Sequence, residues 1–166
     1  MTTSESVFLY RIEHKETNVG PFQTTDAFLQ KMAAFLSLPF NLKTYPSPWD
    51  DGIVLSSVPW FWVFGSPDLD TLMKWISVGA NYEENAQIYA HLQELGFVIR
   101  KFLVEEGDYR VSRSGMQVIF NAHTSRELEL YEEMDFSDYI TAHGVRVCSF
   151  GQFVFSEFTP KDLDYA

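Results

Sequence analysis

The stretch that most constrains the fold is residues 97–121, FVIRKFLVEEGDYRVSRSGMQVIFN. Its first part is rich in β-branched and aromatic residues, which favour strands. The polar residues 105–108 include a glycine and predict a turn, and Ser114-Gly115 predicts another. Residues 116–120 follow as a compact apolar run. The pattern therefore predicts three successive strands joined by turns.

Gln117 is the one polar residue in the last of these predicted strands. Side chains alternate along a strand, so Met116, Val118 and Phe120 share one face while Gln117 and Ile119 share the other. A lone glutamine among such neighbours is either a solvent-facing position or the polar group around which a site is built. The sequence leaves both interpretations open.

An earlier strand is predicted at residues 7–13, VFLYRIE. Alternation places Arg11 on the same face as Val7 and Leu9, although that face is otherwise apolar. Its aliphatic stem can pack there while the guanidinium reaches water. Alternatively, Arg11 is an anion-binding arginine on a central strand.

The remaining elements follow from apolar spacing and from cap residues. Helices are expected from about Asp26 to Pro39 with Thr24 or Thr25 as cap, from Ser66 to about Gly79, from Tyr82 to Leu95 between Asn81 and Gly96, and from Thr124 to about Met134. Strands are expected at residues 53–57, at residues 60–64 with both faces covered, and in a final hairpin at residues 145–149 and 152–158. Because strands and helices do not alternate regularly, this order predicts a single α+β domain, residues 1–166, with a mixed, mainly antiparallel sheet flanked by helices.

Charge and composition narrow the function classes. The chain of 166 residues has a formal net charge of −11 and a pI of about 4.6, which disfavours nucleic-acid backbones and anionic membranes as partners. A single cysteine, Cys148, and the lack of a signal-like start or an apolar span fit a cytoplasmic protein. The four histidines have no second ligand at zinc-site spacing, so no metal is expected. The acidic clusters are solvated surface, or together form a negative face for a basic partner; they are Asp50-Asp51, Glu83-Glu84, Glu105-Glu106 and Glu132-Glu133.

Three segments, in this order, resemble the compact ADP-ribosyltransferase fold. They are Leu9-Tyr10-Arg11, then Trp62-Val63-Phe64-Gly65-Ser66 with the helix after it, then Gly115-Met116-Gln117-Val118-Ile119-Phe120. The resemblance covers residues 7–121, and residues 122–166 form a C-terminal helix and hairpin outside it. It implies NAD as cofactor, catalytic roles for Arg11, Ser66 and Gln117, and cofactor contacts from Tyr10, Arg11, Phe64 and Ser66. Gln117 stands where that family has its catalytic glutamate, and it supplies no carboxylate.

The motifs YRIEH, from Tyr10, and GPF, from Gly20, also resemble small phage- or prophage-encoded proteins. Two functions are therefore expected as alternatives. One is an ADP-ribosyltransferase-like protein that binds NAD or a related nucleotide and modifies a host macromolecule. The other is a non-enzymatic acidic inhibitor, encoded by a phage, that blocks a basic surface of a host defence protein.

Overall fold

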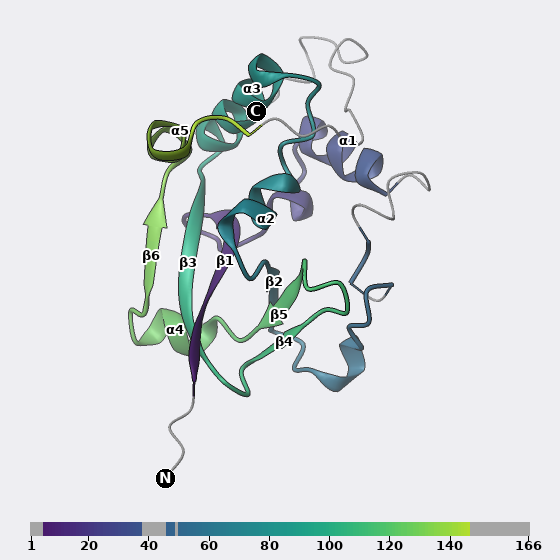
Figure 1. Cartoon of the computed structure of the whole chain (residues 1–166), viewed down its shortest axis with the longest axis vertical. Helices are drawn as coiled ribbons and strands as arrows, with labels where there is room; N and C mark the ends of the chain where they lie inside the picture. Colours follow the sequence, from purple (N-terminus) through teal and green to yellow (C-terminus); the bar gives the residue numbers. More distant parts are fainter. Residues whose placement is uncertain (1–4, 38–45, 49, 147–166) are drawn as a thin grey trace. The chain divides into compact units, whose positions relative to one another are not determined.

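The computed structural model describes residues 5–37, 46–48 and 50–146, and the chain is α+β as expected (Figure 1). The strands of the described part are β1 (Ser6–His14), β2 (Val63–Gly65), β3 (Phe97–Glu105), β4 (Tyr109–Val111), β5 (Val118–Phe120) and β6 (Tyr131–Met134). Its α-helices are α1 (Ala27–Leu36), α2 (Leu69–Lys74), α3 (Tyr82–Glu94), α4 (His123–Glu127) and α5 (Phe136–His143). Short 3-10 turns occur at η1 (Pro21–Gln23) and η3 (Leu55–Ser57).

The strands form two sheets, with the orders β1-β3-β6 and β2-β5-β4. In the second sheet β5 pairs antiparallel with both β2 and β4. The sequence predicts one mixed sheet, so the division into two sheets, with residues 6–14 in one and residues 63–65 and 118–120 in the other, corrects that prediction. Since β2 and β4 occupy both edges of β5, β1 cannot pair with it and lies beside β3 instead.

The chain divides into two compact units. Unit 1 comprises Met1–Arg11, Ser47–Leu72 and Arg100–Glu133, and unit 2 comprises Ile12–Pro46, Met73–Ile99 and Met134–Ala166.

The strand-turn-strand-turn-strand pattern predicted for residues 97–121 is confirmed as β3, β4 and β5. Unit 1 has an apolar core with these fully buried members: Leu9, Phe102, Val104, Val118, Phe120 and Ala122.

Before β2, the structure departs from the sequence prediction. Residues 60–64 were expected as a strand covered on both faces, but β2 begins at Val63 and the Trp60 side chain is 94% exposed. The strand expected at residues 53–57 is a 3-10 turn, in which the Ser57 amide donates to the Val54 carbonyl at 3.0 Å. Another tight turn follows, because the Trp62 amide donates to the Pro59 carbonyl at 3.2 Å. These local turns replace the expected strand pairing.

In unit 2, helix α3 forms as predicted. The Asn81 side chain accepts a hydrogen bond from the Glu84 amide, and Gly96 follows the helix with a φ of +96°. The Tyr89 ring of α3 contacts the rings of Phe136 and Tyr139 of α5, at centroid distances of 5.9 and 6.0 Å. Aromatic packing therefore holds α3 against α5.

Three other helix predictions need correction. Asp26 caps α1 by accepting from the Leu29 amide, so neither Thr24 nor Thr25 is the cap. Helix α2 ends at Lys74, well before Gly79, and its first turn is capped by Asp68, which accepts from the Thr71 amide, and not by Ser66.

The helix expected from Thr124 to Met134 ends at Glu127 and gives way to β6. Its N-cap residue is Ala122, which precedes the expected start at Thr124 and makes no side-chain cap hydrogen bond. Glu129 has a φ of +54°, which is incompatible with a continuing α-helix. The Leu103 amide of β3 then donates to the Leu130 carbonyl at 2.9 Å, so pairing with β3 draws the chain into extended form. The hairpin expected at residues 145–158 and Cys148 lie at or beyond the end of the described residues.

Gly65 permits a close approach of β2 to β1 within unit 1. A Cβ atom on Gly65 would lie 2.3 Å from the carbonyl oxygen of Tyr10 and 3.0 Å from the Phe120 ring. The first of these neighbours is backbone and cannot turn away. A glycine is therefore required here for steric reasons and not for a positive φ.

We expect Gly65→Ala to lower the free energy of unfolding by at least about 3 kcal/mol, because it overpacks a backbone contact. Gly107→Ala is the matched control: Gly107 has a φ of +95° but no heavy atom within 4 Å of its would-be Cβ. That control should cost about 1 kcal/mol through backbone strain alone. Equal losses for both variants in urea unfolding would contradict the steric account.

Candidate functional site

Arg11 lies near the end of the part of β1 that belongs to unit 1. It follows Leu9 on the face that packs into the core, and its side chain is buried. One guanidinium nitrogen, Nη1, donates to the Phe64 carbonyl at 2.7 Å. Arg11 is 7% exposed, so the interpretation in which its guanidinium reaches water is wrong.

Ser66 is joined to β1 through its backbone. The Ser66 amide donates to the Tyr10 carbonyl at 2.8 Å, and the Tyr10 amide donates to the Ser66 carbonyl at 2.9 Å. This isolated bridge links β1 to the chain directly after β2. The Ser66 side chain is fully buried. The structure therefore brings together all four residues expected to bind the cofactor: Tyr10, Arg11, Phe64 and Ser66.

Gln117 lies directly before β5, whose Val118 pairs with Gly65 of β2. Continuing this register by one residue places Gln117 opposite Ser66, on the face that Phe64 and Ile119 share. The Gln117 side chain is only 8% exposed, and its Nε2 donates to Asp51 Oδ2 at 3.1 Å. The interpretation of Gln117 as a solvent-facing position is thereby wrong.

Asp51 is the residue that organises the polar groups around Gln117, and sequence reasoning missed it. Its buried carboxylate also accepts from the Ser114 amide at 2.8 Å and from the Ser114 hydroxyl at 2.6 Å. The Arg113 amide donates to the Asp51 carbonyl at 2.7 Å. An Asp-Asp-Gly turn gives no sign that its second carboxylate is buried; that depends on a partner loop more than sixty residues away.

Two opposing effects set the pKa of the Asp51 carboxyl. Burial raises it, while hydrogen bonds from Ser114, Ser112 and Gln117 lower it, and the net pKa lies below its usual range. The carboxylate is thus ionised at neutral pH and bound by internal donors. Such a group fastens the Asp51 loop to the turn before β5. It is poorly placed to act as a base, because its proton affinity is low.

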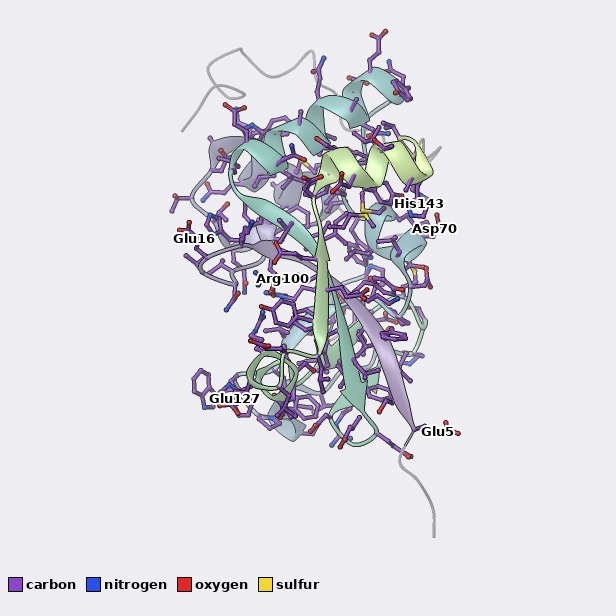
Figure 2. All side chains as sticks on the ribbon, turned by 90° about the vertical axis from the view of Figure 1, so that its left-hand side faces the viewer. Glu5, Glu16, Asp70, Arg100, Glu127 and His143 are labelled. Atoms are coloured by element: carbon purple, nitrogen blue, oxygen red, sulfur yellow. The ribbon has the colours of Figure 1, made fainter. Side chains whose placement is uncertain are left out.

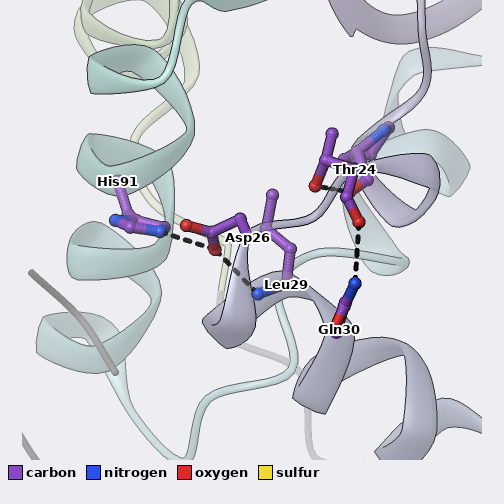
Figure 3. Close-up of polar contacts among 6 residues, drawn as sticks. Thr24, Asp26, Leu29, Gln30 and His91 are labelled. Atoms are coloured by element: carbon purple, nitrogen blue, oxygen red, sulfur yellow. Dashed lines mark hydrogen bonds and ion pairs between the residues drawn. The ribbon is translucent and has the colours of Figure 1, made fainter. Parts of the chain in front are cut away.

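Unit 2 contains a second buried polar contact that sequence reasoning missed. His91 Nε2 of α3 lies 3.0 Å from Asp26 Oδ2, the same oxygen that caps α1 through the Leu29 amide at 3.0 Å (Figure 3). The His91 ring also meets Phe28 edge to face, at a centroid distance of 5.2 Å. One carboxylate therefore caps α1 and ties it to α3, which accounts for the pair as a packing element.

A third buried cluster surrounds Tyr89. Its hydroxyl shares a short hydrogen bond with Ser77 and accepts from the Arg146 amide at 3.4 Å. Burial raises the pKa of Tyr89 to about 12, against the opposing hydrogen bond from Ser77. Asn85 completes the cluster: its Oδ1 accepts from the Gly79 amide and its Nδ2 donates to the Arg146 carbonyl. The neutral phenol thus serves to satisfy backbone and side-chain groups.

Within the described ranges, no three His, Cys, Asp or Glu side chains gather as a metal-binding group. The same part of the chain contains no helix of the length and hydropathy needed to cross a membrane.

We expect the stability that Asp51 provides to depend on pH. Because its folded pKa is lowered, its contribution is complete above its unfolded pKa, near 3.8, and is lost as the pH falls through the folded value. The difference in unfolding free energy between wild type and Asp51→Asn should therefore be constant from about pH 7 to about pH 5 and shrink as the pH falls to about 3. Asp50→Asn removes the same charge from an exposed neighbour and should cost less at neutral pH. A wild-type-minus-Asp51→Asn difference that stays constant with pH would refute this role.

The chain matches a family of known proteins, although other comparisons found no match. No curated protein and no solved structure matches it. Residues 1–135 match the model of a protein family described as Bacteriophage T4 Y00F protein. The match includes every strand of the two sheets and all of unit 1. It confirms the expectation of a phage protein, and since it spans well over half of the 166 residues, the chain belongs to the bacteriophage T4 Y00F protein family.

Proposed function

We propose that this phage protein acts without chemistry of its own, by binding a basic surface of a host protein through residues 127–133, ELELYEE, called here the acidic segment. The observation that carries the proposal is its exposure. Its four glutamates and the two leucines between them are all exposed, on unit 1. Figure 2 shows Glu127 at α4, where the segment begins. Exposed carboxylates interleaved with apolar side chains suit a partner that offers both lysine or arginine and apolar contacts.

The acidic segment carries a net negative charge of its own, although a guanidinium and an imidazole of unit 1 lie beside two of its glutamates. It contains no lysine or arginine. Arg100 Nη2 lies 3.7 Å from Glu133, and His123 lies 3.1 Å from Glu127. The net charge of the whole chain, −11, adds to the negative charge of the acidic segment. Such a field attracts a basic partner over roughly 8 Å at physiological ionic strength.

The other acidic clusters contribute unequally. Asp51 is buried and bonded internally, so it is removed from the negative surface that the sequence suggested. Glu105 and Glu106 are exposed at the end of β3 and in the turn after it, in the same unit. The proposed binding surface therefore centres on the acidic segment, with these two residues as further candidates.

We expect Glu129→Lys/Glu132→Lys to slow association with the host partner about tenfold or more at low salt. The control, Glu16→Lys/Glu94→Lys, changes the net charge equally at exposed positions of unit 2 and should have a smaller effect. Stopped-flow association with the purified partner, captured first from host lysate, measures both. Rates that are insensitive to salt between about 0.1 and 1 M, where the screening length falls from about 10 to 3 Å, would refute electrostatic binding.

A second candidate function is the binding of NAD or a related nucleotide, as the resemblance to ADP-ribosyltransferases implies. What favours it is the meeting of Tyr10, Arg11, Phe64 and Ser66 in one place of unit 1. Against it, Arg11, Ser66 and Gln117 are all buried, and their described polar contacts are with the protein itself. Any nucleotide would have to displace those contacts. It is therefore ranked below the acidic-surface proposal.

The variant Gln117→Glu distinguishes a catalytic role of this residue from a structural one. If Gln117 replaces a catalytic glutamate, the variant should gain NAD hydrolysis or transfer that the wild type lacks. If the Asp51 contact is structural, the new carboxylate meets another and loses a hydrogen bond, which should cost about 1–3 kcal/mol at neutral pH. Repulsion raises the pKa of one of the two carboxyls, so that loss should lessen as the pH falls.

Gln117→Met is the matched control, since it removes the hydrogen bond without adding charge. It should be destabilised without the recovery at low pH. An NAD-turnover assay and urea unfolding on all three proteins measure both effects. Destabilisation of Gln117→Glu without turnover would exclude the transferase-like role of Gln117.

A further inference from the structure

Residues 52–67, GIVLSSVPWFWVFGSP, form a segment without a single charged side chain, in a chain whose net charge is −11. Its side chains include the most exposed large apolar residue among those described: Trp60, at 94% exposure. Val54 is 61% exposed and Phe61 is 43% exposed. Trp60 and Phe61 are called here the aromatic tip. Exposed tryptophan and phenylalanine without charges nearby in sequence are unusual on a surface that need only stay soluble.

The aromatic tip is held in place by contacts within unit 1. Before it, the Ile53 amide donates to the Pro48 carbonyl at 2.9 Å, and Asp51 fastens the loop to the turn before β5. Within residues 52–67, the Ser57 hydroxyl donates to the Val54 carbonyl at 2.6 Å. After the aromatic tip the chain enters β2. The segment therefore runs, through the 3-10 turn η3 and a loop, from the anchored Asp51 to β2 (Figure 1).

The two exposed rings also contact each other, and this contact restricts their orientations. Trp60 and Phe61 meet edge to face, with centroids 5.8 Å apart and planes at 85°. The Trp62 amide donates to the Pro59 carbonyl at 3.2 Å and fixes the turn that presents them. A pre-organised aromatic pair loses little conformational freedom on binding, which is why such residues dominate the binding energy of protein interfaces.

Charges flank the uncharged segment at both ends. Asp50 precedes it and Asp68 follows it, and both are exposed carboxylates. We propose that the aromatic tip docks into an apolar pocket, bordered by lysine or arginine, on the host protein that the acidic segment is proposed to bind. The inference rests on that proposed function. It adds the residues whose contacts should slow dissociation of the complex. A second copy of this chain, or an anionic membrane, would be repelled by the net charge of −11.

The test compares the full-length wild type with Trp60→Ala. The partner captured from host lysate is identified, purified and titrated against each chain. We expect the Kd to rise at least about tenfold for Trp60→Ala, chiefly through faster dissociation. The control Tyr82→Ala removes another exposed ring, on unit 2, and should stay within about twofold of wild type. Because Trp60 is so exposed, the urea midpoint should not change.

Several outcomes would overturn the inference. Equal Kd values for wild type and Trp60→Ala would do so, as would failure of the wild type to capture any protein. So would Trp60-dependent binding to phosphatidylcholine or phosphatidylglycerol vesicles, or Trp60-dependent dimerisation in sedimentation. The proposed function can fail separately. If Trp60→Ala weakens binding but Glu129→Lys/Glu132→Lys does not, the aromatic tip stands and the acidic segment does not.

Discussion

The backbone bridge between Tyr10 and Ser66 is the contact on which the arrangement of unit 1 depends. It joins β1, which belongs to one sheet, to the chain directly after β2, which belongs to the other. A close backbone approach of this kind requires that Gly65 carry no Cβ. Beside it, the Arg11 guanidinium donates to the Phe64 carbonyl, and β2 pairs with β5 as far as Gly65 and Val118. Two backbone hydrogen bonds and one glycine thus hold Tyr10, Arg11, Phe64 and Ser66 together.

Asp51 performs the equivalent task for the loop that precedes β2. Its carboxylate is removed from water at a cost, and the hydrogen bonds from Ser114 and Gln117 offset that cost while keeping it ionised. The benefit is position: the anchored loop continues into the aromatic tip. The hydrogen bonds of this buried carboxylate thus fasten the loop to the turn before β5.

The sequence predicted the elements whose determinants are local. Helix α3 is capped at Asn81 and is followed by Gly96, which favours its termination. The turns between β3, β4 and β5 contain polar residues and glycine, which favour turns. It could not predict burial that depends on distant partners. The apolar residues 60–64 read as a covered strand, yet only tertiary pairing decides that β2 starts at Val63. Gln117 could not be placed without knowing that Asp51 lies beside it.

The same distinction bears on function. Residue types that suit nucleotide chemistry meet in unit 1, but each is bonded to backbone or to another side chain, whereas the exposed surface offers carboxylates and aromatic rings. Long-range attraction by the acidic segment would act mainly on the rate of association, because it operates before contact. Desolvation of Trp60 and Phe61 would act mainly on the rate of dissociation, since apolar contacts form only once the surfaces meet. In the proposed complex these two contributions come from different segments of the chain, so substitutions in one segment should change one rate constant and leave the other nearly unchanged.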